Sequence, residues 1–359
     1  MATENKDRPL TIAVDAMGGD KGPSEVLAGC AEAIRRGLTA ELAVFGREDE
    51  LEAGKNHSEL AGHPISYIHA EDVIKMDDKP SRVLRRSKGT SMWQAIGHVK
   101  EGHADGIVSC GNTGALMAIS RMQLKMIPGV DRPAASALWP SMNGHAVVLD
   151  VGANVEVTAE QLVQFAIMGE AYCRALMETD RPRVGLLNVG EEDLKGSTLI
   201  KNAAKILREA DPEMNFTGFV EGDDISRGEV DVVVTDGFTG NVALKTAEGT
   251  ARMIGDWVKE ALTANLLSKA GAALMMPSLK RLKARMDPAS VNGAPLLGLN
   301  GLVVKSHGGS TAEGFASALM KTEKLAKKPF IEPIAKTVAK VTKRAENVEV
   351  EELTQAAAE

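Results

Sequence analysis

Short apolar runs alternate with helical patterns along almost the whole chain of 359 residues. The runs that predict strands are Leu10–Val14, Glu41–Phe45, Ile65–His69, Asp105–Ser109, Ala146–Val151, Arg183–Val189, Phe216–Val220, Val230–Thr235 and Leu302–Lys305. Apolar residues recur at helical spacing in Ser24–Arg36, Ser91–Lys100, Ala115–Met126, Ala159–Met177, Thr198–Arg208, Val242–Leu262 and Thr311–Lys327. This alternation is typical of a parallel sheet with helices on both faces. We therefore predict an α/β fold with a largely parallel sheet.

Two segments depart from this alternation. Residues 254–286 combine apolar positions at helical spacing with a basic second half, in which no acid occurs between Ala264 and Met286. We expect a helical hairpin there that leaves the sheet. The chain ends in an acidic stretch, residues 346–359, which we expect to be a flexible tail.

The net charge argues against one class of partner. The chain has 42 Lys and Arg against 49 Asp and Glu, a net charge of −7, which repels the phosphates of nucleic acids. Only 3% of the residues are aromatic, too few for the stacking surfaces that bind single strands. We expect no nucleic-acid partner.

The cysteines and the N-terminal residues indicate the compartment. Cys30, Cys110 and Cys173 form no CxxC motif or paired framework, which fits a reducing cytosol. Residues 1–9 are polar and lack the apolar region of a secretory signal. The longest uncharged runs fall short of the roughly 20 apolar residues that a membrane-spanning helix needs. We expect a cytoplasmic protein that at most lies on a membrane surface.

Polar glycine turns follow the predicted strands. They are Asp15–Asp20, Ser109–Gly114, Asp150–Asn154, Asn188–Glu192, Thr235–Asn241 and Ser306–Thr311. In an open α/β sheet the carboxyl ends of parallel strands face one crevice, where ligands bind. Glycine lets the backbone approach a ligand, and free N–H groups at a helix start favour an anion. Backbone conformation usually explains one such turn, but six together predict an anion site within one α/β unit, residues 8–345.

Several familiar motifs are absent from the sequence. Neither Gly111–Gly114 nor Gly237–Gly240 completes the dinucleotide fingerprint GxGxxG, and Lys195–Gly196 reverses the Walker A order. The sequence contains no GxSxG, no HExxH and no cysteine and histidine cluster at zinc spacing. His98 and His103 are five residues apart and do not share a helix face. We expect neither a cofactor nor a metal.

A few reactive side chains stand in or beside the glycine turns. Lys195, Lys245 and Lys305 are candidates to neutralise an anion, although each is also explained as a solvated surface lysine. His307 lies within a turn, where it either donates a proton or hydrogen-bonds within the turn. Cys110 has no visible histidine partner, which favours a small buried residue over a nucleophile.

Together these motifs resemble those of the bacterial phosphate acyltransferase (PlsX) family. The similar segments are Val14–Asp20, Gly111–Met117, Asn188–Gly196, Gly218–Gly222, Thr235–Lys245 and Gly293–Gly308, within residues 10–340. The resemblance implies transfer of an acyl group from acyl carrier protein to orthophosphate, which yields acyl phosphate for phospholipid synthesis. It also implies a homodimer with a fold similar to isocitrate dehydrogenase and phosphotransacetylase. Cys110 stands where the family usually has alanine, which weakens a covalent cysteine mechanism.

Phosphorolysis of a thioester needs an anion site, donors for the tetrahedral oxyanion and an exit for the thiol. A thiol with a pKa of about 8.5 leaves readily, so direct attack by phosphate requires neither metal nor covalent intermediate. We expect Lys195 or Lys245 to offset charge, and Asn241 to donate to the phosphate or carbonyl. Asp236 would orient a neighbour, and His307 would protonate the thiolate. The expected substrate contacts are Asp15, Gly18, Gly19, Gly111, Asn112, Thr113, Gly114, Asn154, Asn188, Gly237, Thr239, Gly240, Lys305 and Ser306.

Two basic stretches suggest where acidic partners bind. Residues 79–88 contain no acid, and we expect the acidic acyl carrier protein to dock there, although a solvated helix face also explains the charges. The docking residues would be Arg82, Arg85, Arg86 and Lys88. The hairpin has an apolar tip followed by cations, which is typical of an interfacial anchor or a dimer helix; an ordinary packed hairpin is the alternative. The expected membrane contacts are Leu266, Leu267, Leu274, Met275 and Met276.

In the resembling family this hairpin is associated with both dimerisation and peripheral membrane attachment. Attachment suits a product that a membrane glycerol-3-phosphate acyltransferase consumes. Three other functions compete with this one. A coenzyme A-dependent phosphate acetyl- or butyryltransferase shares the chemistry, and a decarboxylating dehydrogenase shares the architecture but lacks its aspartate cluster here. A non-catalytic lipid-surface protein would explain the hairpin but not the six turns.

Overall fold

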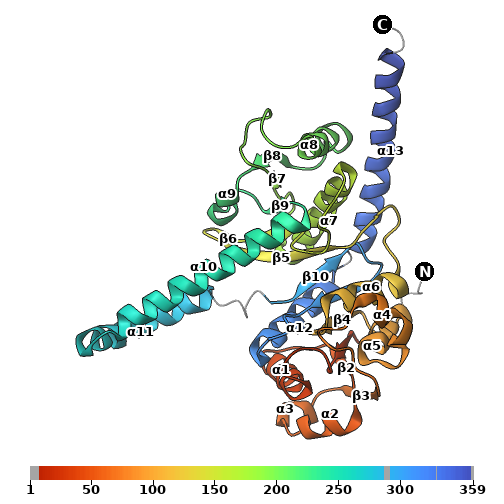
Figure 1. Cartoon of the computed structure of the whole chain (residues 1–359). Helices are drawn as coiled ribbons and strands as arrows, with labels where there is room; N and C mark the ends of the chain where they lie inside the picture. The colour runs from red at the N-terminus through yellow and green to blue at the C-terminus, as the bar shows by residue number, and fades with distance from the viewer. Residues whose placement is uncertain (1–7, 287–291, 329, 357–359) are drawn as a thin grey trace.

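The computed structural model describes residues 8–286, 292–328 and 330–356 and is built around one mixed sheet (Figure 1). The strands are β1 (Thr11–Asp15), β2 (Glu41–Gly46), β3 (Ile65–His69), β4 (Gly106–Ser109), β5 (Ala134–Ser141), β6 (Gly144–Leu149), β7 (Val184–Leu187), β8 (Phe216–Val220), β9 (Val232–Val234), β10 (Ala294–Leu297) and β11 (Leu302–Lys305). Their order is β3-β2-β1-β4-β11-β10-β5-β6-β9-β7-β8. Strands pair in parallel on both sides of the sheet, whereas β11–β10, β10–β5 and β5–β6 pair antiparallel in its middle.

Helices lie on both faces of this sheet and confirm the predicted α/β class. They are α1 (Pro23–Arg35), α2 (Glu48–Gly54), α3 (Ser58–Ala61), α4 (Pro80–Arg86), the 3₁₀ turn η1 (Ser87–Gly89), α5 (Ser91–Lys100), α6 (Thr113–Leu124), α7 (Ala159–Met177), α8 (Thr198–Ala210), α9 (Gly222–Arg227), α10 (Gly237–Thr263), α11 (Leu266–Met286), α12 (Ala312–Ala326) and α13 (Ile331–Ala356). Helix α7 begins with a full capping box of Thr158 and Gln161. Thr311 caps α12 by accepting from the Gly314 N–H.

The two strands that sequence patterns did not predict, β5 and β10, are both antiparallel. β10 is four residues long, contains Pro295 and lies between glycines with positive φ, Gly293 and Gly298. Proline and glycine are turn signals in a sequence, so this pattern indicated a loop. β5 turns directly into β6 with Ser141 opposite Gly144, which explains why β6 begins and ends two residues before the predicted run.

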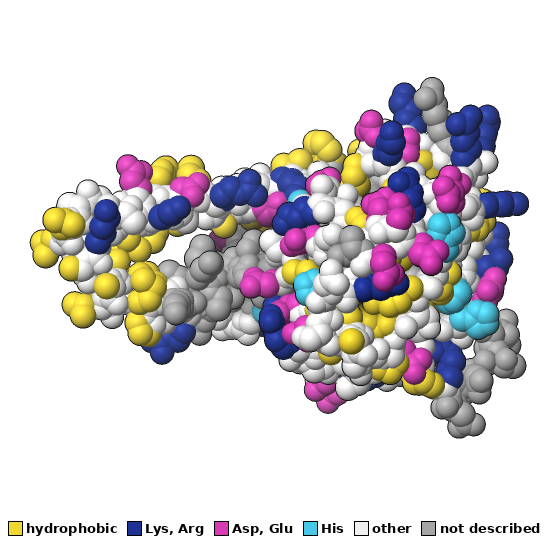
Figure 2. All heavy atoms as spheres, turned by 90° about the horizontal axis from the view of Figure 1, so that it is seen from below, with side chains coloured by type: hydrophobic (Ala, Val, Ile, Leu, Met, Phe, Trp, Pro, Cys, Tyr) yellow, Lys and Arg dark blue, Asp and Glu magenta, His cyan; other side chains and the backbone are white. Residues whose placement is uncertain are grey.

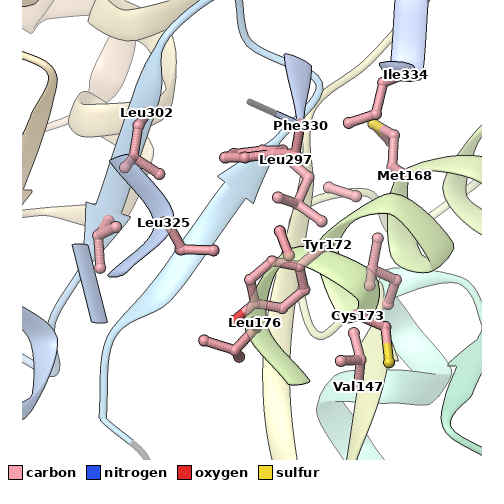
Figure 3. Close-up of a cluster of buried hydrophobic side chains, with 14 of the residues drawn as sticks. Val147, Met168, Tyr172, Cys173, Leu176, Leu297, Leu302, Leu325, Phe330 and Ile334 are labelled. Atoms are coloured by element: carbon pink, nitrogen blue, oxygen red, sulfur yellow. The ribbon is translucent and has the colours of Figure 1, made fainter. Parts of the chain in front are cut away.

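A buried cluster joins the two halves of the sheet (Figure 3). Tyr172 of α7, Leu297 of β10 and Leu325 of α12 meet there beside Phe330, which precedes α13. The same core continues to Val14 on β1 and to other strands of both halves. Burying each of these large side chains contributes about 1.5–3 kcal/mol to the stability of the fold. The two halves of the sheet therefore share one hydrophobic core.

Lys321 is a buried cation beside this core. It lies on α12, is 8% exposed and donates to the carbonyl of Gly293 at 2.7 Å. Burial lowers the pKa of Lys321 to about 7, whereas the pKa of an unfolded lysine is near 10.5. The charged form is therefore penalised in the folded chain at any pH below about 10.5.

We expect this lysine to make stability rise with pH between 7 and 10. The unfolded state binds the proton that the native state releases, so the slope approaches about 1.4 kcal/mol per pH unit in the middle of that range. Urea unfolding at pH 7, 8 and 9 of wild type and Lys321→Met measures it. An equal slope in both proteins would contradict the expectation.

Helices α10 and α11 form the predicted hairpin and project from the body of the molecule (Figure 1). The hairpin is longer than predicted, because α10 begins at Gly237, immediately after the sheet. Hydrophobic side chains gather at its far end (Figure 2). Leu266 and Leu267 at this tip are 85% and 83% exposed. Among the helices described, none is long and apolar enough to cross a membrane.

Helix α13 carries the chain to its C-terminal end (Figure 1). It extends to Ala356, so most of the predicted acidic tail, residues 346–359, is helical. Its last three residues lie outside the described part of the chain. The flexibility of this segment stays a prediction.

Candidate active site

The predicted glycine turns form two groups, one in each half of the sheet. β1, β4 and β11 are parallel neighbours, so their carboxyl ends bring together Asp15, Ser109 and Lys305. β6, β9 and β7 are parallel neighbours in the other half, where the loops that begin at residues 150, 235 and 188 meet. Each half of the sheet therefore presents its own polar edge.

Asp15 is the buried centre of the first group. Its carboxylate accepts hydrogen bonds from Ser91 Oγ and Ser109 Oγ, both at 2.6 Å. Ser109 Oγ in turn accepts from the N–H of Gly111 at 3.0 Å. Burial raises the pKa of Asp15, and the two serine hydroxyls oppose this by stabilising its charge. Asp15 thus positions the loop after β4 through Ser109, whose hydroxyl links the carboxylate to the backbone of Gly111.

The glycines of the first group let three loops pack on one another. A side chain at Gly18 would lie 2.4 Å from the backbone N of Gly111, and one at Gly19 would lie 2.9 Å from Gly308 O. Asp20 also donates its N–H to Gly308 O at 2.9 Å. Gly19 has a φ of +93°, which favours glycine. Close contact between loops therefore explains why residues 18, 19 and 111 are glycines. We had expected these glycines to make room for a ligand.

Lys305 and Asn112 hold this first group together through backbone carbonyls. The Lys305 ammonium donates to Cys110 O at 3.2 Å and to Ser306 O, and burial lowers its pKa. Asn112 caps α6 by accepting from the Ala115 N–H at 2.9 Å. Its amide NH₂ donates to the carbonyls of residues 76 and 78. Both side chains are thus engaged in structure, although we expected them to contact substrate.

His307 remains exposed at the rim of this group. Its Nδ1 accepts from the N–H of Gly309 at 3.1 Å, which is the hydrogen bond within the turn that the sequence left as an alternative. That bond places the proton of the neutral ring on Nε2. Ser306 lies beneath, buried, with its hydroxyl bonded to Asn292 and Ser310. Thr113 and Gly114 lie in the first turn of α6, where Thr113 is exposed.

Asp150 is the buried centre of the second group, and the sequence interpretation did not single it out. Its Oδ1 accepts from the N–H groups of Ala135, Gly152 and Ala153 at 2.9–3.1 Å. Its Oδ2 accepts from the backbone N–H and the side-chain amide of Asn154 at 2.7 and 2.8 Å. Asn154 also donates to the carbonyl of residue 133. One carboxylate thus shapes the whole loop after β6.

Helix α10 starts directly against this loop. A side chain at Gly240 would lie 1.9 Å from Asp150 O, and one at Gly237 would lie 2.6 Å from Asn154 O. Close packing of the helix thus requires both glycines. Asp236 caps the helix by accepting from the N–H and the hydroxyl of Thr239 at 2.8 and 2.7 Å. Asn241, on the next turn, is exposed beside Gly152.

Asn188 and Lys195 occupy the loop after β7. Asn188 is 9% exposed, and its amide NH₂ donates to the carbonyls of Gly190 and Lys195 at 3.0 and 3.2 Å. Its Oδ1 is buried without a partner among the described residues. The Lys195 ammonium contacts Glu192 Oε2 at 2.8 Å, and this hydrogen bond raises the lysine pKa. Lys195 is thus an exposed cation paired with an exposed carboxylate.

Lys245 is less well placed than Lys195. It lies two turns into α10, is exposed and pairs with Glu248 on the same helix at 2.7 Å. Such an i, i+3 pair is typical of a solvated helix surface. The geometry therefore favours Lys195 of the two lysines that the sequence left open.

Comparison with known proteins assigns the chain to a family. Residues 10–332 match the family described as "Fatty acid synthesis protein". The phosphate acyltransferase of Maricaulis maris is 52% identical over 330 residues, which are 90% of this chain and 93% of that protein. The phosphate acyltransferase of Caulobacter vibrioides is 51% identical over 338 residues, 93% of this chain and 92% of that protein. The chain belongs to this family of fatty acid synthesis proteins.

The fold of this family member is also found in a solved structure. A phosphotransacetylase from Streptococcus pyogenes superposes with a TM-score of 0.59 at 19% identity and covers 90% of this chain and 95% of that chain. This likeness confirms the expected phosphotransacetylase-like fold. It carries no assignment of residues.

The two polar groups of this fatty acid synthesis protein are separate in the hydrogen-bond network. Within the described ranges, no hydrogen bond or ion pair links the group around Asp15 to the group around Asp150. The idea that Gly111–Gly114 and Gly240–Asn241 bind one substrate together therefore stays a prediction. Asp150, Glu192 and Ser109 were assigned no role, although each lies in a turn that the sequence had marked, and Ser91 lies in none of those turns.

Proposed function

We propose that this chain is a phosphate acyltransferase, which moves an acyl group from a thioester to orthophosphate. The observation that carries this proposal is the identity of about one half to phosphate acyltransferases over nine-tenths of the chain. The polar loops offer groups that such a reaction needs, because the exposed Lys195 and the exposed amide of Asn241 follow the neighbouring strands β7 and β9. The products are acyl phosphate and a free thiol.

In the reaction a phosphate oxygen attacks the thioester carbonyl, so that a C–O bond forms as the C–S bond breaks. Lys195 faces the developing negative charge and exchanges Glu192 for phosphate or oxyanion. Asn241 donates its amide to the same charge. The electron pair of the broken bond leaves on sulfur, and the thiolate takes a proton from His307 in its imidazolium form, which becomes the neutral ring.

The donor is acyl carrier protein rather than coenzyme A in this proposal. Acyl phosphate formed from either donor is trapped by hydroxylamine as a coloured hydroxamate, and its yield is followed with and without orthophosphate. We expect phosphate-dependent turnover with an acylated carrier protein and much slower turnover with acyl coenzyme A. The reverse preference would favour the coenzyme A-dependent transferase, and no turnover with either would favour a non-catalytic lipid-surface protein.

The basic stretch at α4 and η1 is our proposed dock for the acidic carrier protein. Arg85, Arg86 and Lys88 are exposed and pair with no acid among the described residues. The side chain of Arg82 lies outside the described set. A positive patch without internal counterions attracts an acidic partner over several ångströms and speeds its encounter.

We expect Arg85→Glu/Arg86→Glu to raise KM for the acylated carrier about 10-fold or more and to leave KM for phosphate unchanged. Like charges then repel the carrier but do not reach the reacting atoms. Initial rates at low salt measure both constants. The matched control is Lys336→Glu/Lys343→Glu, two exposed lysines on α13. An unchanged carrier KM in the first variant would remove this dock.

We also propose that the α10–α11 hairpin serves a homodimer and a membrane contact. Exposed Met253, Trp257 and Val258 along α10 offer an apolar stripe to a second copy. Leu274, Met275 and Met276 join the two leucines at the tip, where they are exposed. A peripheral position in the cytoplasm would let a membrane glycerol-3-phosphate acyltransferase receive the acyl phosphate before water hydrolyses it.

We expect Leu266→Glu/Leu267→Glu to lose most of its sedimentation with anionic liposomes. Each buried leucine contributes about 1.5–3 kcal/mol, and an added carboxylate is repelled by anionic lipid. Met142→Glu is the control, because Met142 is 86% exposed on the distant β5–β6 turn. Sedimentation equal to wild type in the leucine variant would count against a membrane role for the tip.

A further inference from the structure

Three metal-ligating side chains that the proposed function does not use meet at the end of α5. His98 lies in the last turn of this helix, Glu101 is its C-cap residue, and His103 follows in the next turn. One ligand atom from each lies within 4.8 Å of the other two. His103 Nδ1 is 3.5 Å from Glu101 Oε2.

The end of the helix brings the two histidines together. The carbonyl of His98 accepts from the N–H groups of His103 and Ala104 at 2.9 and 3.1 Å. Gly102 has a φ of +76°, a conformation that lets the chain turn back. The centroids of the two histidine rings are therefore 5.3 Å apart. Their spacing of five residues separates them on a continuous helix, but α5 ends at Lys100.

The ring of His98 is held in place from the sheet side. It is half-buried and packs edge-on against Phe45 of β2, with centroids 4.8 Å apart. Glu101 and His103 are exposed, so their side chains are free to rotate toward an ion. The cluster precedes β4, at the opposite end of that strand from Ser109 and the candidate active site. An ion bound there would not touch the reacting groups.

We propose that His98, Glu101 and His103 bind a divalent transition-metal ion of the zinc class. Zinc takes imidazole nitrogen at about 2.0–2.1 Å and carboxylate oxygen at about 2.0–2.2 Å, with water completing a tetrahedron around three protein ligands. Ligand atoms in such a tetrahedron lie about 3.3 Å apart, a separation that rotation of the two exposed side chains reaches. Magnesium and calcium prefer oxygen ligands alone and do not fit. The bound ion would tie α5 to the loop before β4.

The test uses the full chain without a purification tag, after removal of metal with a chelator. Calorimetric titration with zinc chloride is expected to give one ion per chain. His103→Ala and Glu101→Gln are expected to weaken binding at least 10-fold, and zinc should raise the Tm of wild type but not of His103→Ala. The control is His69→Ala, because His69 Nε2 lies 3.2 Å from Glu71 Oε2 in an exposed pair of the same two residue types.

Equal zinc affinity in wild type and His103→Ala would overturn the site. The absence of 1:1 binding at zinc concentrations up to about 100 μM would overturn it as well. Competition by millimolar magnesium would also contradict it, since the proposed ligands discriminate against that ion. These readouts follow metal content and Tm alone. Their failure would therefore leave the acyl transfer proposal standing, and failure of acyl transfer would leave the site standing.

Discussion

Replacing Lys195 by alanine is expected to lower kcat/KM for acyl phosphate formation about 100-fold. The lysine is the exposed cation that faces the proposed anion, and losing one such electrostatic group usually has this effect. Asn241→Ala, which removes an amide from the start of α10, is expected to lower kcat/KM by a similar factor. Single-turnover and steady-state rates with an acylated carrier and phosphate measure both variants.

A matched pair elsewhere provides the control for Lys195. Lys336 contacts Glu332 on α13 at 2.7 Å, so Lys336→Ala also removes an exposed lysine from a glutamate partner. Its activity should equal that of wild type. Lys195→Arg should retain part of the activity because it keeps the charge but changes its geometry. Near-normal turnover of both Lys195→Ala and Asn241→Ala, with folding intact, would refute these roles.

Asp150→Ala is expected to cost about 3–5 kcal/mol of the free energy of unfolding. The carboxylate accepts five hydrogen bonds in a buried position, and each buried donor left without a partner costs about 1–3 kcal/mol, reduced where relaxation or water restores a bond. Asp150→Asn should lower the free energy of unfolding by less, since the amide oxygen can still accept hydrogen bonds from the three donors at Oδ1. Denaturant unfolding followed by circular dichroism compares the variants.

The control for Asp150 is Asp180→Ala, because Asp180 is exposed in the loop after α7. It should shift the free energy of unfolding by less than about 0.5 kcal/mol. Activity gives a second readout, since the start of α10 packs on the loop that Asp150 shapes. A stable Asp150→Ala with a normal circular dichroism spectrum would mean that the loop does not depend on this carboxylate.

Local sequence patterns, which involve residues close together in the chain, were enough to predict the class of the fold. The parallel strands and the helix starts at Thr158 and Thr311 follow from local sequence, because buried parallel strands are apolar throughout and caps need one hydroxyl. β5 and β10 depend instead on neighbours far along the chain, and their prolines and glycines resemble loop signals. Tertiary pairing overrides these local signals.

The sequence located the polar turns but not their grouping, since it predicted one crevice and the turns form two groups, one in each half of the sheet. Glycine and asparagine after strands correctly marked the sheet edges at which Lys195 and Asn241 lie. The sequence could not show that Gly18 and Gly240 accommodate other backbone segments, because such contacts join loops remote in the chain. For the same reason Asp150 was missed, since its importance rests on donors contributed by β5 as well as by its own turn.

The position of β11 affects how the chain can fold during its synthesis. β11 lies between β4 and β10, and its register places Leu302 beside Gly106. While the ribosome is still making the segment that includes the α10–α11 hairpin, the nascent N-terminal half therefore exposes one open edge of β4. Open edges recruit other strands, and contacts between distant residues form slowly. Chaperone shielding of the nascent chain would thus protect this protein until its last strand is released.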